Sequence, residues 1–95
     1  MSYHGDMADA SVYLPSTIDR SDIERIVAGV VPEDFNAYSI VDGITYAPGD
    51  LSTAVFLSHR PEDEIMKLAD QILAAAVAEF NIEGMTSREL DELAD

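Results

Sequence analysis

The residues in this chain that most resemble a catalytic pair are Ser58 and His59, because a serine hydroxyl activated by an imidazole can act as a nucleophile. Such a nucleophile also needs its oxygen within hydrogen-bond reach of the ring, an orienting carboxylate and an oxyanion hole. Side chains of adjacent residues seldom point together, and the sequence has no Gly-x-Ser-x-Gly turn. We therefore interpret Ser58-His59-Arg60-Pro61 as a polar loop before a helix, and we expect a protein that is not an enzyme.

Carboxylates are the other side chains that could do chemistry here, as ligands of a metal ion. The runs Glu62-Asp63-Glu64 and Asp91-Glu92 are contiguous, so their side chains fan out around a helix instead of converging on one ion. His4, Asp6 and Asp9 stand in a stretch expected to be flexible, which makes a poor site. The chain has no cysteine, which excludes thiolate zinc sites and disulfides, and no glycine-rich phosphate loop. We expect neither a bound metal nor a cofactor.

The charge balance indicates which partners the protein can have. Five Lys and Arg residues against nineteen Asp and Glu residues give a formal charge of 5 − 19 = −14, whereas 47% of the chain is hydrophobic. Such apolar content predicts a folded core, so the charge must lie outside it. DNA, RNA and anionic lipids would be repelled, so we expect no direct nucleic-acid partner and no membrane partner. A basic protein surface is favoured, and an acidity that serves only solubility or a salty cytoplasm stays open as the alternative.

Length and the ends of the chain predict one small intracellular domain. Ninety-five residues suffice for a single modest core. The first residues lack the basic start and apolar centre of a signal peptide, and the longest apolar-rich run, Ile72 to Ala78, is too short to cross a bilayer. The absence of cysteine fits a reducing compartment. We expect a cytoplasmic protein.

Two apolar stripes at helical spacing predict the main helices that position the acids. The first helix is expected to begin at Ser21, which forms a capping box with Glu24, or earlier at Ser16 or Thr17. It is expected to end at Gly29 and Pro32. The second is expected to begin at Pro61 and to end at Asn81. The stripes consist of Ile23, Ile26, Val27 and Val30 in the first helix, and of Ile65, Leu68, Ala69, Ile72, Ala76 and Phe80 in the second.

Between these helices the sequence predicts a three-stranded antiparallel meander. Asp42-Gly43 is a hairpin signal between strands at 37–41 and 44–47, and Pro48-Gly49 fits a second turn before a strand at 52–57. Residues 11–14 are expected to form either an edge strand or an extended lead-in. Helices cover one sheet face, and the second face is covered by the opening strand or tail, or is left open for a partner or a second copy. The order of helix, meander and helix resembles that of the double-stranded-RNA-binding domain in element order alone; where that family has phosphate-gripping lysines, this chain has Glu62-Asp63-Glu64.

The C-terminal segment predicts a short third helix, because Thr86 and Glu89 form a capping box. Residues 74–78 are apolar on every side of the second helix and are therefore expected to be covered on more than one side. Leu90 and Leu93 could cover them, or the short helix could dock on another molecule. The expected organisation is a flexible tail at 1–10, one α+β domain at 11–85 and the short helix at 86–95.

From these features we predict a non-catalytic acidic interaction protein that docks on a basic partner surface. Its sharpest form is the occlusion of a nucleic-acid-binding protein by carboxylates that mimic phosphates, by analogy with small acidic proteins of viruses and mobile elements. The alternative is a self-associating structural or accessory domain whose acidity serves solubility or halophilic adaptation, and which forms a homodimer through the apolar second half of the second helix or the open sheet face. A small enzyme with no identifiable site is the third alternative. The acids expected to bind the partner are those that exceed what the helix dipoles need or that lie in exposed arcs: Asp63, Asp70, Glu79, Asp91, Glu92 and Asp95.

Overall fold

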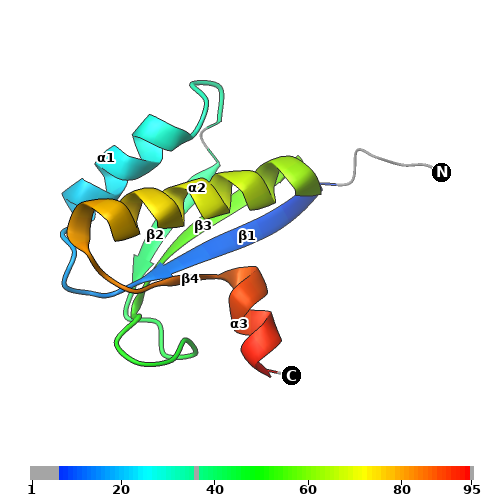
Figure 1. Cartoon of the computed structure of the whole chain (residues 1–95). Coiled ribbons are helices and arrows are strands. Elements are labelled where there is room, and N and C mark those ends of the chain that lie inside the picture. Colours follow the sequence, from blue (N-terminus) through cyan, green and yellow to red (C-terminus); the bar gives the residue numbers. More distant parts are fainter. Residues whose placement is uncertain (1–6, 36, 95) are drawn as a thin grey trace.

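The computed structural model describes residues 7–35 and 37–94 and has an α+β fold, as the sequence predicts (Figure 1). Its elements are β1 (Met7–Leu14), α1 (Arg20–Val30), β2 (Tyr38–Asp42), β3 (Thr53–Pro61), α2 (Glu62–Phe80), β4 (Met85–Thr86) and α3 (Ser87–Ala94). The sheet order is β2-β3-β1-β4, and all neighbouring strands are antiparallel. This is the arrangement of the ferredoxin-like or split βαβ fold with a helix added at the end. A fold used for many functions does not identify one.

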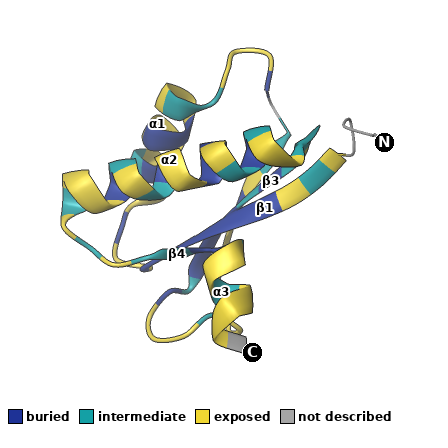
Figure 2. Cartoon of the chain, turned by 45° about the vertical axis from the view of Figure 1, so that its right-hand side comes forward, coloured by how far each residue is buried: buried dark blue, intermediate teal, exposed yellow. Residues whose placement is uncertain are grey.

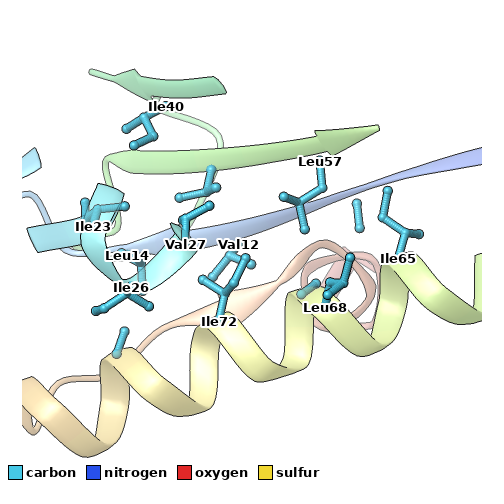
Figure 3. Close-up of a cluster of buried hydrophobic side chains, with 14 of the residues drawn as sticks. Val12, Leu14, Ile23, Ile26, Val27, Ile40, Leu57, Ile65, Leu68 and Ile72 are labelled. Atoms are coloured by element: carbon cyan, nitrogen blue, oxygen red, sulfur yellow. The ribbon is translucent and has the colours of Figure 1, made fainter. Parts of the chain in front are cut away.

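Helices α1 and α2 cover one face of the sheet, which we call the helix face (Figure 1). Both predicted stripes point into the core, with Val30 and Phe80 only half-buried at its margin. The strands contribute alternate residues, such as Val12 and Leu14 of β1, because successive side chains point to opposite faces (Figure 3). None of the helices in the described part of the chain is long and apolar enough to cross a membrane.

Strand β1 lies in the middle of the sheet and is not an edge strand. It pairs with β3 along its length and with β4 through Val12 and Tyr13. Residues 7–10 of the predicted tail belong to this strand, whereas the rest of that tail lies outside the described residues. Because the apolar run at 11–14 is short, the sequence predicts either an edge strand or an extended lead-in there. Yet Val12 packs under the helices and Tyr13 packs on the opposite face, so this segment is buried on both sides and takes the central position.

The predicted meander is wrong in one strand, because residues 44–47 form part of a loop that spans residues 43–52. Strand β2 pairs directly with β3, with Val41 opposite Ala54. The loop is closed at its base, where the backbone N–H groups of Gly43 and Ile44 both donate to the carbonyl of Ser52, at 2.7 and 3.1 Å. A strand at 44–47 would place polar Thr45 toward the helices, whereas β3 places apolar side chains there, so β3 is the better partner.

The helix ends match the sequence signals in part. The predicted Ser21 capping box does not form, because α1 begins one residue earlier with Asp19 as its N-cap. Asn81 ends α2 in the left-handed conformation, at φ 53°. The capping box of α3 is confirmed: the N–H of Thr86 donates to Glu89 Oε1 at 3.0 Å, and the N–H of Glu89 donates to Thr86 Oγ1 at 3.4 Å.

The opposite side of the sheet, here called the back face, is partly covered by the 43–52 loop and by α3 (Figure 2). Leu90 of α3 packs near Tyr13 and Ala54, so α3 does not pack on the alanine-rich segment. The expectation that residues 74–78 are covered on more than one side is wrong, since Ala74, Val77 and Ala78 are exposed. Helix α3 takes the back face because that side of the sheet is the larger uncovered apolar surface: it presents Tyr13 and Phe56, whereas residues 74–78 offer mostly methyl groups.

Candidate partner-binding surface

The acidic side chains of the described residues all lie at the surface, and none is buried. The arginines are held by carboxylates within the same molecule. Each lies within 4.0 Å of at least one acid: Arg20 with Glu24 and Asp42, Arg25 with Asp22 and Glu79, Arg60 with Asp34 and Glu64, and Arg88 with Asp70. The charges of these four arginines are therefore dispersed in separate ion pairs, and the excess charge at the surface is negative.

Two of the predicted partner-binding acids, Asp63 and Asp70, share the outer surface of α2. They are seven residues apart, which places them on one side of the helix. Both line an open groove of about 770 Å³ between α2 and the start of α3, together with Lys67 and Arg88. The contact between Asp70 and Arg88, at 4.0 Å, links the two helices. The groove is therefore mixed in charge and half apolar in character, with Met66 in its lining.

Glu79 has a different environment from these two acids. It forms hydrogen bonds with the guanidinium of Arg25 on α1, one of them from Nη1 to Oε1 at 3.2 Å. These bonds hold the pKa of Glu79 below its ordinary value and raise the pKa of Arg25 above its own. Glu79 thus joins α1 to α2, which leaves it less available to an external cation than a carboxylate without an internal partner.

Asp91 and Glu92 are exposed on α3, and neither forms an ion pair with another described residue. Leu93 follows them with 64% of its surface exposed. Asp95, the sixth predicted acid, lies outside the described residues. Of the predicted set, the structure thus brings Asp63 and Asp70 together on α2 and Asp91 and Glu92 together on α3.

The Ser58-His59 pair lies in a β-bulge and not in a loop. The β1–β3 register pairs Ala8 with Arg60 and Ala10 with Leu57, so Asp9 stands opposite two residues. His59 lies in the bulge with a backbone φ of 68°, which is uncommon for residues other than glycine, and its side chain is exposed. The hydroxyl of Ser58 donates to the carbonyl of Ala37 at 3.2 Å. This bond gives the serine a structural role that ties β3 to the segment before β2.

Arg60 is the arginine most enclosed by its surroundings, with 19% of its side chain exposed. Its guanidinium lies 4.7 Å from the ring centre of Phe35 and forms 3.1 Å contacts with Asp34 and Glu64. The arrangement anchors Asp34 and Phe35, which follow α1, to the start of α2. The sequence indicates the contact of Arg60 with Glu64, because the two residues stand at helical spacing. It does not indicate the contact with Phe35, which is distant in the chain.

A second concave surface lies between the 43–52 loop and α3, and we call it the loop–α3 hollow. It measures about 300 Å³ and is lined by Tyr46, Ala47, Pro48, Leu90 and Leu93. The ring of Tyr46 meets that of Tyr13 edge to face, at 5.7 Å between centres and an interplanar angle of 89°. Partial desolvation is the main cause that raises the pKa of Tyr46, and the neighbouring Tyr13 raises this pKa further. The sequence does not reveal this hollow, because its pattern predicts a strand at 44–47 and not a loop.

Within residues 7–35 and 37–94, no three His, Asp or Glu side chains are grouped closely enough to hold a metal ion. Comparison with family models, with curated proteins and with solved structures found no match.

Proposed function

We propose that this chain is a non-catalytic interaction protein that docks its acidic exterior on the basic surface of a protein partner. The observation that carries the proposal is the composition of α3. Asp91 and Glu92 have no ion-pair partner among the described residues, and Leu93 beside them is 64% exposed. Acidity that serves only solubility does not require an exposed large apolar side chain within the same helical turn. Acids next to an apolar contact are typical of an interface with a cationic protein.

The proposal predicts binding that depends strongly on ionic strength. Exposed charges attract each other over about one Debye length, which is about 10 Å at 0.1 M salt and about 3 Å at 1 M. The experiment immobilises the full chain, captures binders from native cell extract at low salt and elutes them in salt steps. The partner identified is then purified, and its dissociation constant is measured across the same salt range. Affinity that is indifferent to salt would refute the proposal.

A matched pair of variants tests which acids matter. The triple variant Asp63→Asn, Asp91→Asn, Glu92→Gln removes three charges from the α2–α3 side of the molecule. The control Asp9→Asn, Asp19→Asn, Glu33→Gln removes three charges from exposed acids elsewhere. The first variant is expected to weaken binding more than the control. Equal losses would mean that only net charge counts and that the predicted residues have no special part.

The proposal in its narrower form concerns a partner that binds nucleic acid. Carboxylates on α2 and α3 would occupy the positions of phosphates, which the net charge of −14 favours. The measurement is competition: a labelled duplex is bound to the purified partner, and the acidic protein is titrated in. Displacement by this protein and not by the α2–α3 triple variant is the expected result. A ternary complex without displacement would restrict the function to docking alone.

The second candidate function is self-association, and one observation favours it. Among the described residues β2 pairs only with β3, so its other edge offers unpaired backbone groups, and Val41 on this strand is 40% exposed. A second copy could pair edge to edge, with the acidity serving solubility. Sedimentation at low and at molar salt tests this candidate, with Val41→Lys as the variant that should dissociate a dimer. A monomer at every concentration and salt level would dismiss it.

A further inference from the structure

In the loop–α3 hollow, exposed large apolar side chains line a concave surface. Tyr46 is 57% exposed and Leu93 is 64% exposed, and both line one concavity together with Pro48. Large apolar side chains that stand singly on a surface are common, whereas several around one concavity mark a binding site. Val77 is the contrasting case, because it is exposed on the outer side of α2 and lines none of the concavities described above.

The floor of the hollow is held in place by the fold. Leu90 and Ala47 pack against the buried back-face cluster of Tyr13, Leu51 and Ala54. The edge-to-face contact with Tyr13 orients the ring of Tyr46. The capping box at Thr86 fixes the start of α3, and with it the wall that carries Leu93. A partner would therefore meet a largely preformed surface and lose little free energy in ordering it.

The charge around the hollow identifies what can occupy it. The 43–52 loop contains Asp50 and neither Lys nor Arg. Helix α3 presents Asp91 and Glu92, and its single cation, Arg88, faces Asp70 on α2. A second copy of the chain would bring a charge of −14 against the same acids, and an anionic lipid surface would be repelled as well.

We propose that the loop–α3 hollow receives the apolar face of a cationic amphipathic segment of a partner protein. This inference rests on the proposed function and specifies where the partner is anchored. The volume equals that of about ten liquid water molecules, enough for one or two large side chains spaced three or four residues apart on a helix. Lysines or arginines elsewhere on that segment would meet two walls whose unpaired charges are negative, with Asp50 in the loop and Asp91 and Glu92 on α3.

The test uses defined peptides, because the chain contains no tryptophan and a peptide tryptophan can be observed alone. One peptide carries a tryptophan and three leucines on one helical face and lysines elsewhere. The matched peptide keeps the tryptophan and lysines but has serine in place of each leucine. At low salt the amphipathic peptide is expected to bind about tenfold or more tightly than the serine peptide, since it buries leucine as well as charge, and its tryptophan emission shifts to the blue.

Variants of the full chain locate the binding. Leu93→Ser and Tyr46→Ser are each expected to lower the affinity for the amphipathic peptide about tenfold and to leave the affinity for the serine peptide unchanged. The matched control Val77→Ser removes an exposed apolar side chain elsewhere and should change neither affinity. Leu93 is the decisive position, because its exposure makes Leu93→Ser the variant least able to disturb folding, and circular dichroism checks each variant.

The possible outcomes separate this inference from the proposed function. If both peptides bind equally, or if Val77→Ser weakens binding as much as Leu93→Ser, the hollow is not the anchor, while the acidic surface still binds cations. If neither peptide binds at low salt, the proposed function fails as well. Equal binding of a peptide with glutamates in place of the lysines would overturn the charge argument. A dimer that Leu93→Ser dissociates would identify a second copy as the occupant and overturn the inference.

Discussion

The two faces of the sheet differ in how their apolar residues are used. On the helix face, sixteen buried residues among those described form one cluster under α1 and α2. On the back face the buried apolar cluster consists of Tyr13, Leu51 and Ala54, beneath a loop and a short helix. The helix face therefore supplies most of the stability. The back face keeps Tyr46 and Leu93 partly in solvent, so substitutions of these two residues are expected to cost less stability than substitutions under the helices.

The strongest test of this contrast is a cavity on each face. Ile72→Ala on the helix face is expected to lower the free energy of unfolding by about 2–5 kcal/mol, because Ile72 is fully buried under the sheet. Leu90→Ala on the back face should lower it by less than half of that, since Leu90 is only partly buried. Urea denaturation measures both, with Val77→Ala as the exposed control on α2. Equal losses would show that the back face is as important to stability as the helix face.

A second test concerns Gly84, the residue before β4, where the chain passes from α2 on the helix face to α3 on the back face. A Cβ added at Gly84 would lie 2.8 Å from the carbonyl oxygen of Tyr13 and 2.8 Å from Cδ1 of Leu73. The backbone oxygen cannot move aside easily, so Gly84→Ala is expected to destabilise the protein by about 1–3 kcal/mol and to loosen β4 and α3 first. Denaturation gives the first quantity and amide exchange the second. The control Gly29→Ala adds the same methyl group in α1 with no atom within 4 Å and should be neutral or stabilising.

The helix face was predictable from sequence because its signal is local. Ile65, Leu68 and Ile72 repeat at helical spacing, and their burial follows from that spacing alone. The capping box of α3 was equally local, since Thr86 and Glu89 are three residues apart. Signals of this kind need no knowledge of the rest of the chain.

The back face was not predictable, because its contacts join distant segments. Residues 44–47 do not form the expected strand, because β2 pairs with β3 instead. The preference of β2 for β3 depends on side chains that come together only in the assembled sheet. The central place of β1 depends on partners more than forty residues away, such as Ala54 and Met85. The hydrogen bond between Arg25 and Glu79 joins two helices, and the spacing of these residues in the sequence does not indicate it. The loop–α3 hollow followed from these same long-range contacts.

A smaller effect is expected from the capping box that holds α3 on the back face. Thr86→Val keeps the volume of this buried side chain but removes the hydroxyl that accepts the N–H of Glu89. The loss should be about 1 kcal/mol and should appear as faster amide exchange in α3 than in α2. Thr45→Val, at an exposed loop threonine, is the matched substitution and should change stability by less than about 0.5 kcal/mol. Unchanged exchange in α3 would mean that Leu90 alone positions the helix.

The smallest effect is expected at the helix face, where Arg25 and Glu79 join α1 to α2 at the surface. Arg25 lowers the pKa of Glu79 in the folded state, so the pair stabilises the protein above the ordinary glutamate pKa, and this stabilisation is lost as pH falls through the lowered value. Glu79→Gln should therefore be slightly less stable than the parent at neutral pH, with the difference vanishing in acid. Glu92→Gln is the control of opposite sign, because removing an unpaired acid relieves repulsion among like charges. Denaturation across pH at low salt compares the two. If both variants gained stability equally at neutral pH, Glu79 would act as one more repelling charge, and the ion pair would contribute nothing to holding the two helices together.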